Sequence, residues 1–189
     1  SRAQKLRLRG IAREEGNLGT RAEELAQAIG AEGTKVAAGL LANVASDLAR
    51  LSRDLFEEGD FQTGERVQGL QRDVEEALLW LLDALRAEQA RRQNERQDQK
   101  QDPNQGQPPG RPPLVPDSTE LKLLRRMEVE LREALDRLRV LAPELQEGEP
   151  DPQFLQEVAR LASRHERLTE LFRDLRARVG IEAPESAQD

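Results

Sequence analysis

The sequence predicts an all-α protein, built as an elongated bundle of coiled-coil-like helical hairpins joined by a Pro/Gln-rich linker. Apolar residues recur at three- and four-residue intervals through most of the 189 residues, the spacing of one helix face. The aromatic side chains are one Trp and four Phe, without any Tyr. The core must therefore be built from Leu, Ala and Val, which favours helices packed along their lengths. Capping residues, glycines and prolines interrupt the apolar pattern where helices should begin and end.

The first part of the chain predicts helix over about residues 2–15 and again over about 20–30. Between them lies Gly16-Asn17-Leu18-Gly19, which is typical of a helix end. Thr20 followed by Glu23 fits a capping box that would start the second segment. Two short helices or one kinked helix are both compatible with this pattern.

The N-terminal helices, residues 1–96, include a long antiparallel hairpin over about 35–96. Thr34 can cap its first helix, which should reach about residue 58, and Thr63 can cap its second. Only four residues, starting at Gly59, separate the two helices, so an antiparallel turn is expected. The two apolar stripes consist of Val36, Leu40, Val44, Leu48, Leu51 and Leu55, and of Val67, Leu70, Val74, Leu78, Leu81 and Leu85.

Residues 97–117 form the predicted linker, rich in Pro and Gln, and the preceding helix should fray near residue 96. Leu114 and Val115 are the apolar residues of this linker, so we expect them to dock on the helices. Residues 118–180 should form a second hairpin that packs on the first, and residues 181–189 a flexible tail.

The second hairpin has strong start and stop signals. Asp117 with Glu120 fits a capping box, Pro152 suits the first position of the last helix, and Gly180 should end it. Its predicted stripes are Leu121, Leu124, Met127, Leu131, Leu135 and Leu138, and then Phe154, Val158, Leu161, His165, Leu168, Phe172, Leu175 and Val179.

The residue types argue against most enzymes. The chain has no cysteine, which excludes disulfides and thiolate metal sites, and its glycines fit no phosphate-binding loop. His165, the single histidine, would need an acid at position 162 for a helical di-iron motif, and Ala162 stands there. We therefore expect no catalytic residue, cofactor, metal ion or small-molecule substrate. The enzymatic alternative requires His165 or carboxylates to converge in a pocket.

The segment around Trp80 has two readings. Leu79, Trp80 and Leu82 make this helix apolar almost all the way round. Such a helix is either buried at the centre of the bundle, which is the favoured reading, or part of a protein interface, where Trp is an enriched anchor. Both can hold in a self-associating bundle, so these three residues are the candidate interface, and we expect a protein partner, with self-association favoured.

Charge is unevenly distributed along the chain. The basic N-terminal residues are Arg2, Lys5, Arg7, Arg9 and Arg13. The rest of the chain contains 24 basic residues (29 minus these five) and 36 acidic ones. This excess of negative charge does not favour nucleic-acid binding. The basic segment is compatible with membrane proximity, and the alternative is a solvated first helix.

Part of the chain resembles a known group of proteins. The segment VQGLQRDVEEALLWLLDALR is followed by the linker and by PLVPDSTELKLLRRM. The match to a P-L-x-P-x-x-x-E-L-K-L-L-R pattern consists of Pro113, Leu114, Pro116, Glu120, Leu121, Lys122, Leu123, Leu124 and Arg125. Over about residues 35–140 the chain is similar to uncharacterised, helix-rich bacterial envelope proteins, mostly of planctomycetes and related phyla. This resemblance implies an envelope-associated helical interaction protein.

Taken together, the sequence predicts a non-enzymatic structural, scaffolding or protein-interaction module that self-associates. The predicted location is the bacterial cell envelope, on the periplasmic side. The alternative is a cytoplasmic coiled-coil adaptor or regulatory protein, and a signal or anchor encoded upstream would distinguish the two.

Overall fold

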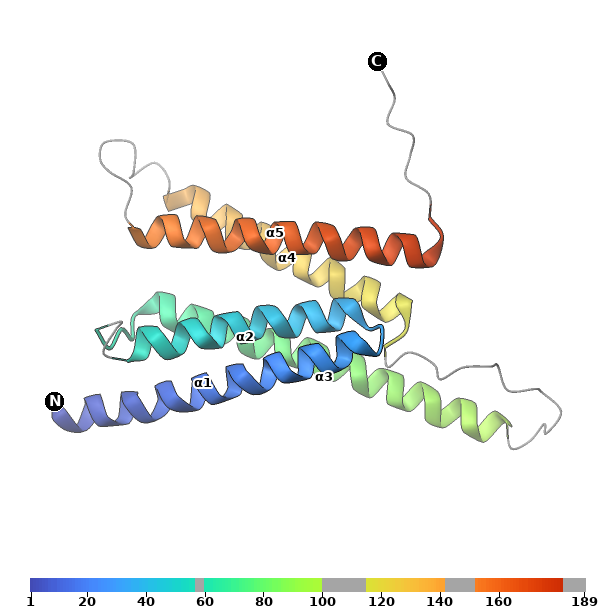
Figure 1. The fold of residues 1–189 in the computed structure, drawn as a ribbon, viewed down its shortest axis with the longest axis horizontal. Coiled ribbons are helices and arrows are strands. Elements are labelled where there is room, and N and C mark those ends of the chain that lie inside the picture. The colour runs from blue at the N-terminus through green and yellow to red at the C-terminus, as the bar shows by residue number, and fades with distance from the viewer. Residues whose placement is uncertain (57–59, 100–114, 142–151, 182–189) are drawn as a thin grey trace, which may run out of the picture. The chain divides into compact units, whose positions relative to one another are not determined.

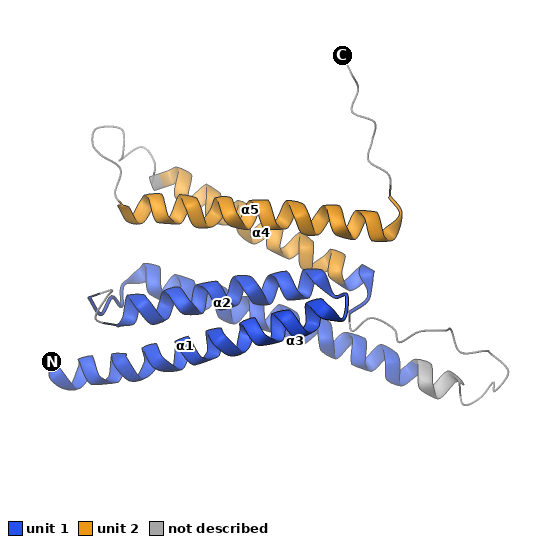
Figure 2. Ribbon diagram, viewed as in Figure 1, with its two compact units in different colours: residues 1–119 blue, residues 120–189 orange. Residues whose placement is uncertain are grey.

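The computed structural model describes residues 1–56, 60–99, 115–141 and 152–181, and within these ranges the chain is all-α (Figure 1). The helices are α1 (Arg2–Ala31), α2 (Lys35–Leu55), α3 (Glu65–Gln99), α4 (Asp117–Leu141) and α5 (Pro152–Val179). The predicted fold class is thereby confirmed. The chain divides into two compact units, residues 1–119 and 120–189 (Figure 2), and each is described by itself.

Helix α1 runs without a break through the glycines that suggested a helix end. The Thr20 hydroxyl donates a hydrogen bond to the Gly16 carbonyl oxygen (3.2 Å), one turn back within the same helix. Thr20 is therefore an interior helix residue, and its predicted role as a cap was wrong. The glycines weaken the helix locally, so something outside α1 must account for their presence.

Close packing against α2 accounts for them. A Cβ atom placed on Gly19 would lie 3.3 Å from both the Ala45 carbonyl oxygen and the Leu48 Cβ. One on Gly16 would lie 3.1 Å from the Ser52 Oγ. The buried residues of α1 are all small: Ala12, Gly19, Ala22 and Ala26. Because this face lacks bulky side chains, the backbones of α1 and α2 approach closely.

The turn between α1 and α2 differs from the predicted cap at Thr34. Gly33 takes a left-handed φ of 89°, and the Thr34 backbone N–H donates to the Ile29 carbonyl oxygen (3.3 Å). Thr34 precedes the helix as predicted, but its side chain makes no capping hydrogen bond. Its Oγ1 is buried without a hydrogen-bond partner. Gly33, rather than a side-chain cap, makes the reversal of the chain possible.

Helix α2 is the centre of unit 1 and packs against both α1 and α3. All six apolar residues of its predicted stripe are buried, which confirms that stripe. In α3 the stripe holds at Val67, Leu70, Val74 and Leu81. It fails at Leu78, which is exposed, and at Leu85, which is only half-buried.

The turn between α2 and α3 is longer than the four residues predicted. Asp60 and Phe61 both take left-handed φ angles (53° and 55°), and the Gln62 N–H donates to the Asp54 carbonyl oxygen (2.8 Å). Asp54 also accepts a hydrogen bond from the Arg66 Nη2 (3.3 Å). This turn ends α2 at residue 55 and delays α3 to residue 65, so the predicted cap at Thr63 was wrong.

Unit 2 is an antiparallel pair of helices. Early residues of α4 meet late residues of α5: Arg178 donates to Glu120, and the Arg164 Nη1 donates to the Glu130 Oε1 (2.9 Å). Leu131 and Leu161 lie in the core that the two helices share. Gly180, with a φ of 74°, ends α5 where the sequence predicts.

Half of the predicted stripe of α5 points away from this core. Exposed members are Val158, His165, Phe172 and Val179. The inward positions between the leucines are held instead by charged residues, including Arg160 and Arg164, which pair with Glu157 and Glu130. In α4, Leu121 and Leu135 are likewise exposed. A seam that mixes leucines with ion pairs cannot be recognised from hydrophobic spacing alone.

The predicted linker lies largely outside the described residues. Helix α3 continues to Gln99, three residues beyond its predicted end, and α4 begins at Asp117. Leu114 lies outside the described residues, whereas Val115 is 1% exposed. Docking of the linker through these two residues stays a prediction, as does packing of the second hairpin on the first. Residues 182–189 of the predicted tail are not described.

Candidate functional site

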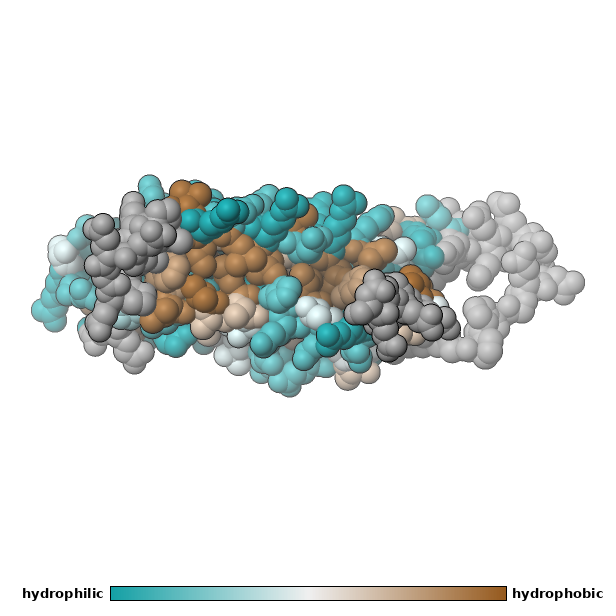
Figure 3. Space-filling view, turned by 90° about the horizontal axis from the view of Figure 1, so that it is seen from above, coloured by the Kyte–Doolittle hydropathy of each residue, from teal (hydrophilic) through white to brown (hydrophobic). Residues whose placement is uncertain are grey.

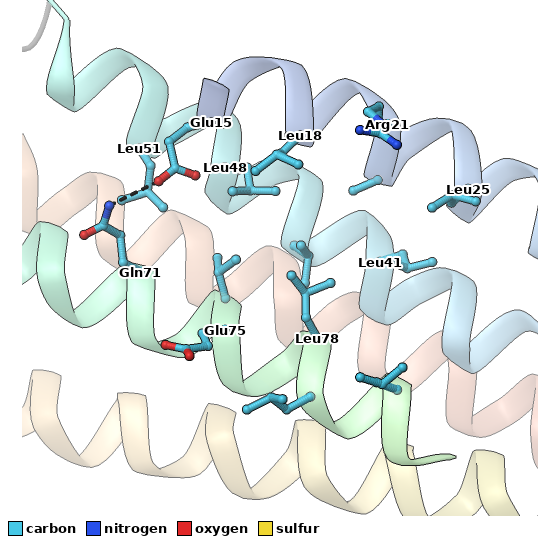
Figure 4. Close-up of a pocket in the computed structure, with 15 residues that line it drawn as sticks. Glu15, Leu18, Arg21, Leu25, Leu41, Leu48, Leu51, Gln71, Glu75 and Leu78 are labelled. Carbon is cyan, nitrogen blue, oxygen red and sulfur yellow. Dashed lines mark hydrogen bonds between the residues drawn. The ribbon is translucent and has the colours of Figure 1, made fainter. Parts of the chain in front are cut away.

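Unit 1 contains an apolar groove of about 560 Å³ between α1 and α3, with α2 as its floor (Figure 4). Both outer helices pack on α2. The floor residues are Leu41, Val44, Leu48 and Leu51. The apolar wall residues are Leu18, Ala22 and Leu25 from α1, and Val74, Leu78, Leu79 and Leu82 from α3.

The five leucines of the walls remain substantially accessible to solvent. Their exposed fractions run from 40% at Leu82 to 54% at Leu25. Single exposed leucines are common on protein surfaces, but a contiguous set of them around one groove is unusual. The groove is therefore the feature of unit 1 that most needs a functional explanation.

The sequence of α1 explains its wall of the groove. The small residues that face α2 draw the two backbones together, as shown at Gly19. At 100° per residue, Leu18 and Leu25 lie to one side of this small-residue face and point past α2 (Figure 4). These leucines cannot be buried by α2, so they form the edge of the groove.

Polar groups define one end of the groove and its rim. The Gln71 Nε2 of α3 donates a hydrogen bond to the Glu15 Oε1 of α1 (3.1 Å), which bridges the two walls. Arg21 and Glu75 also line the site, one on each wall. The groove thus offers an apolar centre with charges of both signs beside it, the general pattern of protein interfaces.

Two of the three interface residues predicted from the sequence line this groove. Leu79 and Leu82 form part of the α3 wall. Trp80 does not line the groove, because it lies about 200° around the helix from Leu78, on the other side of α3. Its side chain is half-buried there. The predicted interface did not include the leucines of α1, although Leu18 and Leu25 stand seven residues apart, a helical signal that is present in the sequence.

Some of the basic N-terminal residues contact the protein itself. The Lys5 Nζ lies 4.8 Å from the centre of the Phe61 ring, and the Arg9 Cζ lies 6.0 Å from it. These cation–π contacts connect α1 to the turn between α2 and α3. Arg2, Arg7 and Arg13 are exposed. Membrane proximity of this segment stays a prediction.

A smaller apolar groove of about 330 Å³ lies on unit 2, between α4 and α5. Its apolar lining residues are Leu121, Leu124, Leu168 and Phe172, with Arg125, Glu128 and Thr169 beside them. Figure 3 looks onto α4 and α5 and shows apolar residues in a band between hydrophilic ones. Phe172 and Leu121 are among the exposed apolar residues of these two helices.

The described residues include few groups arranged for chemistry. His165 is exposed on α5 and lies neither in the groove of unit 1 nor in that of unit 2. In the described parts of the chain, no three His, Cys, Asp or Glu side chains gather as metal ligands would. Glu88 is buried in α3, where hydrogen bonds from Arg91 and then Arg92 hold its pKa below 4.5 despite the opposing effect of desolvation. This cluster links successive turns of one helix.

Comparison of the chain with protein-family models, curated proteins and solved structures finds no match. Among the described helices, none combines the length and apolar character needed to cross a bilayer. The two grooves, and chiefly the larger one, are therefore the features from which a function can be inferred.

Proposed function

We propose that this protein is a non-enzymatic helical interaction module, and that the groove of unit 1 binds an amphipathic helix of a protein partner. The observation that carries the proposal is the set of five exposed leucines around a floor made by α2. Binding of an amphipathic helix in an apolar groove is a recurrent mode of recognition, in which residues spaced three and four apart act as anchors.

The apolar surface of the groove can offset much of the free-energy cost of binding a helix. Burying one leucine completely contributes roughly 1.5–3 kcal/mol, so each half-exposed wall leucine contributes about 1 kcal/mol. The five wall leucines together contribute about 5 kcal/mol, and the apolar face of the bound helix adds a similar amount. Association costs an estimated 4–15 kcal/mol, so the apolar contacts alone bring binding near balance. Charges on the rim, Glu15, Arg21 and Glu75, then select the partner and its direction.

The arrangement also suits a scaffolding role, because the walls of the groove are held by contacts within unit 1. Its α1 wall is held by close backbone packing on α2, and its end is bridged by Glu15 and Gln71. A site formed before binding loses less conformational entropy when it is occupied.

We place this module in the bacterial cell envelope on the strength of the resemblance at residues 113–125. A cytoplasmic adaptor with the same groove is the alternative. Fractionation of the producing cells, with the chain detected in its native form, distinguishes the two locations.

Site-specific photo-crosslinking in the producing cells tests the proposed function. A photoreactive amino acid at Leu79 lies in the groove wall, and one at Glu76 lies on the same helix but outside the groove. We expect Leu79 to give discrete protein adducts that Glu76 does not give, with the crosslink on an apolar face of a helix. Equal crosslinking at both positions would contradict a role for the groove in partner binding.

A further inference from the structure

We propose that the helix bound in the groove is α1 of a second copy of this chain, in an antiparallel symmetric dimer. This inference rests on the proposed function, because it names the partner of the same groove. Each copy would place its own α1 between α1 and α3 of the other copy. Such an interface is self-complementary and closes at two subunits.

Helix α1 carries an exposed apolar stripe that is symmetric about Leu18. Ile11, Leu18 and Leu25 stand seven residues apart and are 43%, 49% and 54% exposed. A seven-residue step drifts by only ~20° on an α-helix, so the three side chains lie along one line. If two copies of α1 run antiparallel with Leu18 at the twofold axis, Leu18 meets its symmetry mate. Ile11 then lies opposite Leu25 of the second copy, on both sides of the axis.

The charged residues beside this stripe favour an antiparallel pair. Glu14 and Glu15 precede Leu18 by one turn, and Arg21 follows it by one turn. Antiparallel pairing brings Arg21 opposite the Glu14–Glu15 pair of the second copy, twice in each dimer. Parallel pairing would instead leave Arg21 and the Glu14–Glu15 pair at different heights along the two helices, so these opposite charges would not meet. Neither Arg21 nor Glu14 has an ion pair within the described residues of its own chain.

The same stripe of α1 also borders the groove. Leu18, Arg21 and Leu25 all line it, opposite Leu78 and Leu82 of α3. A second α1 lying on this stripe therefore contacts α3 as well, and covers the exposed leucines of both walls. The small face of α1 stays on α2, so dimer formation needs no rearrangement of unit 1.

Charge reversal on the full-length chain tests the pairing. The molar mass in solution is measured by sedimentation and light scattering up to about 100 μM. We expect a dimer, weakened on the order of tenfold by Arg21→Glu and likewise by Glu14→Arg. Mixing these two variants should give a heterodimer, because each then meets the opposite charge. Glu24→Arg, a charge reversal of equal size on another side of α1, should leave dimerisation unchanged.

Engineered cysteines test the register independently, because the chain has no cysteine of its own. Leu18→Cys lies at the proposed axis and should oxidise to a disulfide-linked dimer. Ile11→Cys and Leu25→Cys should each link poorly alone and efficiently when mixed. Leu6→Cys serves as the control, because Leu6 is about as exposed as Leu25 but lies outside the stripe of Ile11, Leu18 and Leu25. Helix content by circular dichroism confirms that each variant is folded.

A chain that is monomeric at every concentration overturns the inference. A dimer that Arg21→Glu does not weaken, or in which Leu18→Cys forms no disulfide between the two copies, overturns it as well. The photo-crosslinking experiment separates this failure from failure of the proposed function. Adducts at Leu79 with a different protein alone would retain the groove as a binding site and reject a second copy as its occupant. No groove-specific adduct together with a monomeric chain would reject both.

Discussion

Replacing Gly19 by alanine should destabilise the protein, although the same change elsewhere in α1 should stabilise it. A glycine inside a helix costs roughly 0.5–1 kcal/mol relative to alanine, because its unfolded backbone is more flexible. At Gly10, in the same helix, an added Cβ meets nothing within 4 Å. Gly10→Ala is therefore expected to raise the free energy of unfolding by about 1 kcal/mol.

At Gly19 the added methyl group has no room. It would lie 3.3 Å from the Ala45 carbonyl oxygen and 3.5 Å from the Ala49 backbone nitrogen of α2. Carbon atoms pack best at about 3.5–4.0 Å, and forcing one extra methyl into a close contact costs ~1–3 kcal/mol. Taking about 2 kcal/mol for the contact and about 1 kcal/mol for the helix gain, Gly19→Ala loses about 1 kcal/mol. The two variants should differ by about 2 kcal/mol.

Unfolding in urea and by heat, followed by helix ellipticity at ~222 nm, measures this difference. For a chain of this length, 2 kcal/mol corresponds to roughly 4–8 °C between the melting temperatures. Gly69→Ala in α3, where an added Cβ also meets nothing within 4 Å, is a second stabilising control. If Gly19→Ala stabilised the chain as much as Gly10→Ala, close packing of α1 on α2 would be refuted, and with it the explanation of the groove wall.

Three further predictions concern buried polar groups. Thr34→Val removes a buried hydroxyl that has no hydrogen-bond partner and should raise the free energy of unfolding by about 1 kcal/mol, whereas Thr34→Ser should lower it. Urea unfolding of the two variants checks the opposite signs. Arg178→Met removes a hydrogen-bond donor from the fully buried Glu120 and should lower the free energy of unfolding by about 2 kcal/mol. A double-mutant cycle with Glu120→Gln should show that the losses of the two single variants are not additive. Hydrogen bonds from Arg91 and then Arg92 lower the pKa of Glu88 in the folded chain below its unfolded value of 4.5. The ionised Glu88 therefore stabilises the fold above pH 4.5, and this stabilisation is lost as the pH falls through the pKa of the folded state. Arg91→Gln should therefore reduce the loss of stability between neutral pH and about pH 3, and an unchanged pH profile would count against this ion pair.

The existence of the helices could be read from the sequence because the signals involved are local. The six apolar residues of the α2 stripe are buried as predicted, since a helix packed between two others must bury one continuous face. Pro152 and Gly180 mark the ends of α5 because their backbone preferences act within one turn. Nothing distant in the chain is needed to set these features.

Positions that depend on another helix could not be read in this way. Gly19 suggested a helix end, but it serves the contact with Ala45, 26 residues further along the chain. His165 follows the apolar spacing of α5, yet it points outward because Arg164 turns inward to meet Glu130 of α4. Hydrophobic spacing does not report which side of a helix will find an oppositely charged partner.

The sequence by itself determined that this protein is all-α and where most of its helices lie, and it named Leu79 and Leu82 as interface candidates while favouring their burial. Only the tertiary structure showed that Leu18 and Leu25 of α1 join them around one groove. A groove exists when two helices pack on a third without closing on each other. That arrangement depends on how closely α1 approaches α2, a long-range contact that the pattern of one helix does not encode.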